Sequence, residues 1–122
     1  MEHFIATMLA KPGEEQKVAD YYRNLESELQ GAKGFLGRTV MQSKPGSFAH
    51  DVQQRITPEE AAQHPPHDHE ASVMFVIHER WESKADRWNF SSNLKVDRRE
   101  VLFPYILPEH SHEYYEDVVT SS

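Results

Sequence analysis

Cysteine is absent from the 122-residue sequence, and so are long apolar segments. The first absence excludes disulfides, thiol nucleophiles, iron–sulfur clusters and zinc sites that depend on thiolates. The longest apolar run, from Val73 to Ile77, has five residues, whereas a membrane helix needs roughly 20. The N-terminal residues also lack the basic and apolar regions of a signal peptide. We therefore expect a cytoplasmic protein with no membrane partner.

Positive charge is the scarcer sign, because 13 Lys and Arg residues stand against 20 Asp and Glu residues, for a net charge of −7. Such a field repels phosphate backbones, so we expect no nucleic-acid partner. The length fits one domain over residues 1–122. A chain of this size buries enough apolar surface to fold without cross-links.

The first half of the chain is predicted to form a strand, a helix and a strand. Residues 3–10 are mostly apolar and end at a Lys-Pro-Gly turn, which is typical of a buried strand. A helix over residues 14–30 follows, because apolar side chains recur there at steps of three and four. These side chains are Val18, Tyr22, Leu25 and Leu29. Residues 35–43 form the next predicted strand, which a second Lys-Pro-Gly closes.

Residues 44–71 are a polar insertion that is rich in proline and histidine. Within it, Thr57 precedes a proline and two glutamates, which is the pattern of a short helix with an N-cap. We interpret the insertion as an addition to the single domain.

The second half repeats the order of the first. Residues 72–81 are the strongest strand signal, since they are rich in β-branched and aromatic side chains. Helical segments are predicted at 83–92 and within 96–105, and residues 112–120 are the predicted last strand.

Together these elements predict an α+β fold. The order β-α-β, insertion, β-α-β is that of the ferredoxin-like split βαβ, in which both helices lie on one face of an antiparallel sheet. Both faces of the strands carry apolar residues, so the face of the sheet without helices must also be shielded from water. In so small a chain a second copy is the natural cover, and we expect a homodimer that forms a dimeric α/β barrel.

The element order, together with the stretch FVIHERWES from Phe75 to Ser83 that runs into a helix, resembles the antibiotic biosynthesis monooxygenase family. A strand that ends in Glu-x-Trp before a polar pair and a helix is characteristic of these small dimeric barrels. The resemblance covers most of the chain outside the insertion. It implies oxidation of an aromatic, polyketide-like substrate, an anthrone or a quinol, with O₂ and with no cofactor. The expected partners are therefore a small aromatic molecule, O₂ and a second copy of the chain.

The resemblance also implies a substrate pocket between the sheet and the helices. Strand periodicity places alternate side chains of residues 72–81 on the same side. The side that ends at the tryptophan holds Phe75, Ile77, Glu79 and Trp81. The corresponding face of the first strand would hold Ile5, Thr7 and Leu9. We expect Thr7 and Phe75 among the substrate contacts.

Four further side chains are candidates for the site. Trp81 either lines the pocket or is a core tryptophan, and Trp88, which we expect the helix to turn inward, has the same two interpretations. His78 is the candidate catalytic base, since imidazole takes up a proton near neutral pH. It lies on the side of its strand opposite Trp81, however, where it would face the dimer barrel. Arg38, in an otherwise apolar strand, pairs either with Glu79 or with an anionic substrate.

The histidines of the insertion support a different hypothesis. His64, His67 and His69 lie close together with two carboxylates, and imidazoles and carboxylates suit zinc, iron, copper or nickel. They lack the HExxH spacing of a known metal motif. A metal- or haem-dependent enzyme that uses these histidines is one alternative function. A non-catalytic dimer that binds a small ligand, with its tryptophans only shaping the pocket, is the other.

Overall fold

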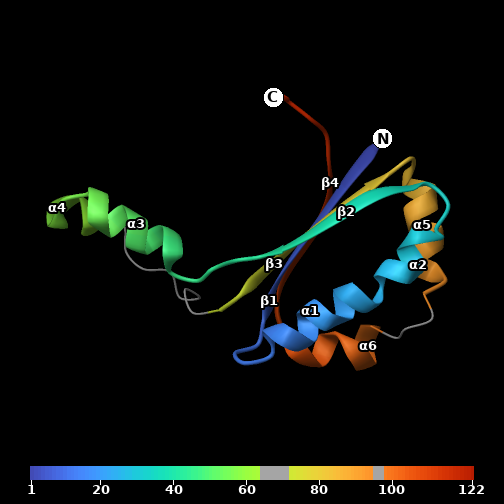
Figure 1. Cartoon of the computed structure of the whole chain (residues 1–122), viewed down its shortest axis with the longest axis horizontal. Helices are drawn as coiled ribbons and strands as arrows, with labels where there is room; N and C mark the ends of the chain where they lie inside the picture. The colour runs from blue at the N-terminus through green and yellow to red at the C-terminus, as the bar shows by residue number, and fades with distance from the viewer. Residues whose placement is uncertain (64–71, 95–97) are drawn as a thin grey trace.

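The structure of the protein, a computed structural model, describes residues 1–63, 72–94 and 98–122. Four antiparallel strands form one sheet in the order β2-β3-β1-β4 (Figure 1). Their bounds are Glu2–Ala10 for β1, Phe35–Gln42 for β2, Met74–Trp81 for β3 and Ile106–Tyr115 for β4. The central positions belong to β1 and β3, whose sequences are rich in large apolar residues. The α+β, ferredoxin-like fold expected from the sequence is confirmed.

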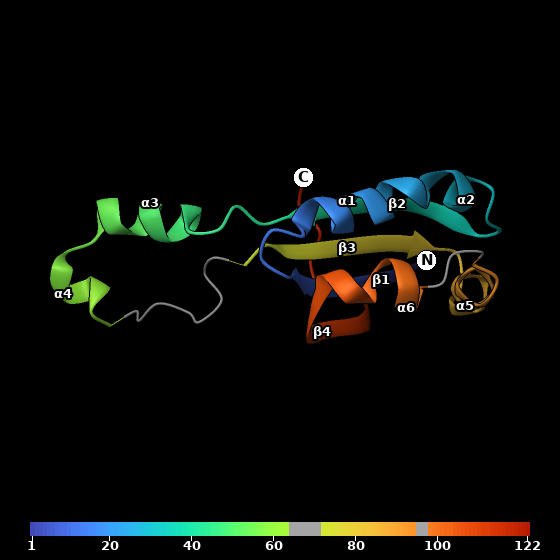
Figure 2. The same ribbon diagram turned by 90° about the horizontal axis from the view of Figure 1, so that it is seen from below.

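Helices lie along one face of this sheet, which we call the inner face (Figures 1 and 2). They are α1 (Glu15–Asn24), α2 (Glu26–Gln30), α5 (Lys84–Ser92), α6 (Arg98–Val101) and the short 3-10 helix η1 (Phe103–Tyr105). The single helix predicted over residues 14–30 is divided at Leu25. This residue keeps right-handed helical dihedrals (φ −79°, ψ −13°), so α2 follows α1 without a loop.

Residues 44–63 of the insertion form an arm that projects beyond the ends of β2 and β3 (Figures 1 and 2). It contains α3 (Ser47–Arg55) and α4 (Pro58–Ala61). Thr57 caps α4 as predicted, because its hydroxyl accepts a hydrogen bond from the backbone N–H of Glu60 at 3.2 Å. The sequence did not predict α3, in which every side chain is exposed or half-buried.

The last strand begins earlier in the chain than predicted. β4 spans Ile106–Tyr115 instead of residues 112–120, so Pro108 lies inside it. Proline cannot donate to a strand ladder and is tolerated on edge strands and at bulges. β4 is an edge strand, and its register against β1 shifts between Met8 and Ala10, opposite this proline. The strand therefore continues through Pro108.

Strand register decides which side chains of β1 face the helices. Ala6 pairs with Ile77, and Thr7 pairs with Val76. Directly paired residues of antiparallel strands point to the same face. Because Ile77 is fully buried under the helices, Ala6 faces the helices too, and Thr7 faces the opposite side, which we call the outer face.

The predicted pocket face of β1 is therefore wrong. The expected set was Ile5, Thr7 and Leu9, whereas the inner face holds Phe4, Ala6 and Met8. Thr7 instead shares a hydrogen bond with the hydroxyl of Ser111 on the outer face. Both parities of β1 are apolar, so its sequence alone could not choose between them. The parity predicted for β3 is confirmed: Phe75, Ile77 and Trp81 are buried side chains of the core.

The outer face of the sheet keeps several apolar side chains at least partly accessible to solvent. They are Ile5, Met41, Met74, Val76 and Tyr115. Within the described parts of the chain, no helix is long and apolar enough to cross a membrane.

Candidate functional site

A partly open cavity of about 100 Å³ lies between the inner face of the sheet and the helices, and Phe103, His110 and His112 in its wall are exposed. Most of its wall is apolar or aromatic, from Phe4, Tyr21, Leu25, Leu29, Phe90, Leu102 and Phe103. Its polar wall residues include Arg38, Glu79, Arg87, His110 and His112. An apolar hollow with a few convergent polar groups is the usual form of a small-molecule site.

A buried ion pair forms one corner of this cavity. Nε of Arg87, in α5, donates a hydrogen bond to Oε1 of Glu79, in β3, at 3.0 Å. The indole Nε1 of Trp81 donates to the same oxygen at 2.9 Å. The side chains of Arg87 and Glu79 are only 9% and 14% exposed. Because buried charges require a partner, each of the two fixes the position of the other.

Arg87 also contacts the aromatic wall. Its guanidinium carbon lies 3.3 Å from the centre of the Phe4 ring, in a cation–π contact. The ion pair and the ring together hold a positive charge at a fixed place in the cavity wall. Such a preorganised charge can stabilise an oxyanion that forms on a bound molecule.

Two histidines of β4 complete the polar part of the wall. His110 and His112 lie on the inner face with ring centres 5.1 Å apart, and the His112 ring lies 6.0 Å from that of Phe4. Sequence reasoning did not assign them to the site, because it began the last strand at residue 112. Their His-x-His spacing places both on one face once the strand begins at Ile106.

His78, the candidate base, lies on the outer face of the sheet, away from the cavity. One of its ring nitrogens, Nε2, is 2.8 Å from Nδ1 of His3, whose Nε2 is 3.6 Å from a carboxylate oxygen of Asp117. Burial, and then the charges of His3 and Arg80, lower the pKa of His78 below its ordinary value, against a smaller opposing effect of Asp117. Because His78 does not line the cavity, a base in the cavity must be another residue.

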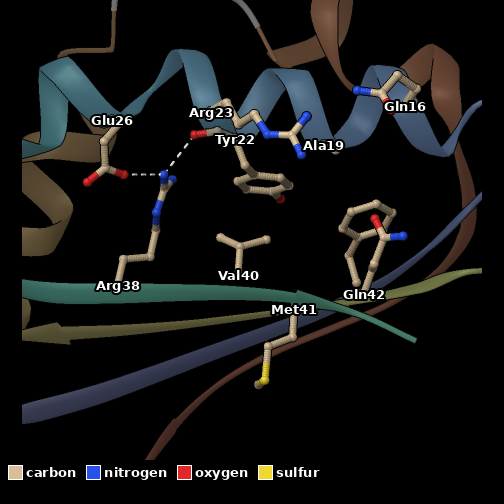
Figure 3. A pocket seen from close by; sticks show the side chains of 10 residues that line it. Gln16, Ala19, Tyr22, Arg23, Glu26, Arg38, Val40, Met41 and Gln42 are labelled. Carbon is tan, nitrogen blue, oxygen red and sulfur yellow. Dashed lines mark hydrogen bonds and ion pairs between the residues drawn. The ribbon is translucent and has the colours of Figure 1, made fainter. Parts of the chain in front are cut away.

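Arg38 does not pair with Glu79, so the first of its two expected partners is wrong. Its Nη2 donates to Oε2 of Glu26 at 2.8 Å and to the backbone oxygen of Tyr22 at 2.7 Å (Figure 3). The side chain stands between β2 and α1 at an open groove of about 600 Å³. Phe75, expected in the pocket, lines this groove and not the cavity.

The expectation that Trp88 turns inward is wrong, since this residue is 60% exposed. The buried position of α5 belongs to its neighbour Arg87, because the ion pair with Glu79 sets which face of the helix meets the sheet. Trp88 lines a separate hollow of about 260 Å³ next to the cavity, with Arg87 and His112 in the shared wall.

Comparison of the sequence with protein-family models and with curated proteins gives no match. Solved structures, in contrast, superpose over nearly the whole chain. A Nitrosomonas europaea protein classed as an antibiotic biosynthesis monooxygenase has a TM-score of 0.65 at 11% identity, over 99% of this chain and 93% of its own. The Pseudomonas aeruginosa protein PA3566 has a TM-score of 0.62 at 16% identity, over 97% and 94%. A variant of SnoaB, a cofactor-independent oxygenase from Streptomyces nogalater, has a TM-score of 0.58 at 8% identity, over 98% and 94%.

The chain has the antibiotic biosynthesis monooxygenase fold. Within this monooxygenase fold, Trp81 is fully buried. It packs edge-on against Phe35, with ring centres 5.3 Å apart, and in a tilted arrangement against Phe90, at 5.6 Å. The tryptophan lies behind Glu79 and not in the cavity wall. Its link to the cavity is the hydrogen bond from its indole to the Glu79 carboxylate.

Trp81→Phe is expected to lower the free energy of unfolding by about 1–2 kcal/mol, because it removes a donor to a buried carboxylate and leaves part of the indole volume empty. Urea unfolding measures this loss. The matched control is Trp88→Phe, the same change at an exposed position, with an expected effect of at most about 0.5 kcal/mol. Equal losses in the two variants would contradict a specific role for the Trp81 indole.

The metal alternative depends on residues that the structure leaves undescribed. His64, His67 and His69 lie outside the described residues. Among residues 1–63, 72–94 and 98–122, no group of three or more His, Asp or Glu side chains is arranged to hold a metal ion.

Proposed function

We propose that the protein is a cofactor-independent monooxygenase that oxidises an aromatic substrate, of anthrone or quinol type, with O₂. The observation that supports this function is the aromatic cavity whose wall combines the imidazole of His112 with the buried pair of Arg87 and Glu79. The fold is shared with SnoaB, which is described as a cofactor-independent oxygenase. That likeness is an argument by analogy, and the cavity is the argument from this chain.

The first step of the proposed reaction is a proton transfer. An anthrone or hydroquinone has an acidic C–H or O–H, and His112 is the general base that removes this proton. Negative charge then develops on the oxygen of the substrate. Arg87 stabilises it from a position that Glu79 and Phe4 already fix, so little reorganisation is needed as the charge appears.

O₂ then reacts with the substrate anion itself. One electron passes from the anion to O₂, and the resulting substrate radical and superoxide combine to form a C–O bond. The peroxide takes up the proton that His112 removed, and the hydroperoxide loses water to leave a carbonyl group. For an anthrone, a CH₂ group and O₂ become C=O and H₂O, and the substrate supplies all four electrons.

Oxygen consumption by metal-stripped protein tests this function. The assay uses anthrones and hydroquinones with and without a chelator, and spontaneous oxidation without protein is subtracted. We expect protein-dependent uptake of one O₂ per anthrone that the chelator leaves unchanged. Substrate binding without uptake would favour the non-catalytic binding protein. Uptake that the chelator abolishes and added metal restores would favour the metal-dependent enzyme.

The proposal includes a homodimer that is formed through the outer face of the sheet. The apolar side chains there make a surface that a partner would bury. We expect light scattering to give twice the chain mass of 14.2 kDa. Val76→Asp, in the central strand β3, is expected to produce monomers, whereas Ser27→Asp, exposed on α2, adds the same charge and leaves the dimer intact. A monomeric wild-type protein would contradict the proposed interface.

A further inference from the structure

The cavity is too small for the substrates that the proposed function requires. Its volume is about 100 Å³, whereas a cavity of roughly 150 Å³ holds a single benzene ring. Sites for drug-sized ligands span about 300–1,000 Å³. A polycyclic substrate must therefore extend into a second space.

The groove between α1 and β2 provides such a space (Figure 3). Its volume is about 600 Å³, and it shares two wall residues, Tyr22 and Arg38, with the cavity. Its apolar wall includes the half-buried side chains of Ala19 and Val40, whereas the rings of Tyr22 and Phe75 are almost fully buried. The amide of Gln42 adds a polar group. Tyr22 and Arg38 therefore mark the place where the two spaces meet.

The two partners of the ion pair between Arg38 and Glu26 are buried to different extents. The Arg38 side chain is 5% exposed, while that of its partner Glu26 is 53% exposed. Glu26 can turn outward and be hydrated at little cost, because an exposed carboxylate gains little from one ion pair. Arg38 would then be a buried guanidinium without its anion, and a buried charge without a counterion is costly. The geometry therefore favours replacement of Glu26 by another anion.

The second cation in the cavity wall behaves differently. Arg87 and its partner Glu79 are both buried, so separation of that pair leaves two uncompensated charges. The hollow beyond Arg87 is also smaller, at about 260 Å³. The cavity is thus more easily opened at Arg38 than at Arg87.

The charges around the groove are balanced, so an anion binds Arg38 by displacing Glu26 and not through a net positive field. Arg23 lines the groove in addition to Arg38, although Asp20 lies 3.2 Å from Arg23 and offsets part of its charge. A hydrogen bond from Gln30, and then the hydrogen bond and charge of Arg38, lower the pKa of Glu26 below its ordinary value. Glu26 is therefore ionised at neutral pH and competes with any incoming anion.

We propose that the groove and the cavity form one elongated site for a polycyclic aromatic acid, whose carboxylate replaces Glu26 on Arg38. The carboxylate lies where the two spaces meet, so that part of the ring system lies against Ala19 and Val40 in the groove and part reaches the cavity. This assignment rests on the proposed function for the ring chemistry. The recognition of the carboxylate rests on Arg38 and Glu26 alone.

Equilibrium binding of two probes tests the assignment. The probes are anthraquinone-2-carboxylate and its neutral counterpart 2-methylanthraquinone, titrated calorimetrically at neutral pH. We expect the wild-type protein to bind the acid more tightly. Glu26→Gln removes the competing anion and is expected to strengthen binding of the acid about tenfold while leaving the neutral probe unchanged. Arg38→Gln is expected to abolish the preference for the acid.

Glu59→Gln is the matched control, because it removes one negative charge from α4 in the arm, far from the groove. Melting curves of each variant exclude unfolding, and if Arg38→Gln does not fold, Glu26→Gln and Glu26→Ala decide the question. Equal binding of the two probes, binding of neither, or a Glu26→Gln protein that matches wild type would overturn the assignment.

The assay does not depend on turnover, so the two proposals fail separately. Charge-dependent binding without oxygen uptake would remove the proposed function and retain the groove. Oxygen uptake without charge-dependent binding would retain the proposed function and remove the carboxylate site at the groove.

Discussion

Arg87→Met is expected to lower the free energy of unfolding by about 3–5 kcal/mol, the largest loss that we expect from a single substitution in this chain. Methionine fills most of the space that the arginine stem occupies, but it leaves the buried Glu79 carboxylate without its cation. Glu79 must then take up a proton or draw in water, and both cost free energy. Urea unfolding, with the midpoint and the slope determined separately, measures the effect.

Two controls identify the ion pair as the cause. Arg55→Met breaks the pair with Asp51 in the arm, where the side chains are 72% and 64% exposed, and its expected cost is about 0–1 kcal/mol. The double variant Arg87→Met with Glu79→Gln removes both charges and is expected to recover much of the stability. A loss below about 1 kcal/mol for Arg87→Met alone would mean that the pair is effectively solvated and not a fixed part of the cavity.

His112→Gln is expected to reduce the rate of oxygen uptake about 100-fold or more, the range that general base catalysis contributes. Glutamine retains hydrogen-bonding ability and has a similar size, but it cannot accept the proton from the substrate. Initial rates with a fixed anthrone, and the melting temperature of the same sample, separate a catalytic loss from unfolding.

His78→Gln is the matched control for this experiment, because it makes the same change on the opposite face of the sheet. Its expected effect on the rate is about twofold or less, as for residues that do not reach the reacting atoms. If His78→Gln inactivated the protein and His112→Gln did not, the outer face and not the cavity would be the place of the chemistry.

The fold was largely predictable because its signals are local. The apolar run before the Glu-x-Trp of β3, the amphipathic helices and the proline–glycine turns each mark an element without information from distant residues. The placement of Thr7 failed for the opposite reason. Both faces of β1 are apolar, so only its pairing with β3, a long-range property, decides which face meets the helices.

The polar part of the site was less predictable, because it depends on one buried charge. Glu79 lies on the apolar parity of β3, and a carboxylate there requires a cation. That requirement could have indicated Arg87, which lies one turn into the next helix, in place of the more apolar Trp88. His110 and His112 were not assigned to the site because the predicted last strand begins at residue 112, whereas β4 begins at Ile106 and continues through Pro108 on the sheet edge.

The most direct test of the proposed oxygenase is the fate of the two oxygen atoms. Metal-stripped protein is supplied with an anthrone and ¹⁸O₂ in ordinary water, in the presence of a chelator, and the product is examined by mass spectrometry. The proposed reaction places one ¹⁸O atom in the new carbonyl group and the other in water, at a rate well above that without protein. A product without ¹⁸O from a short reaction that limits carbonyl exchange, or a rate equal to spontaneous oxidation, would contradict it.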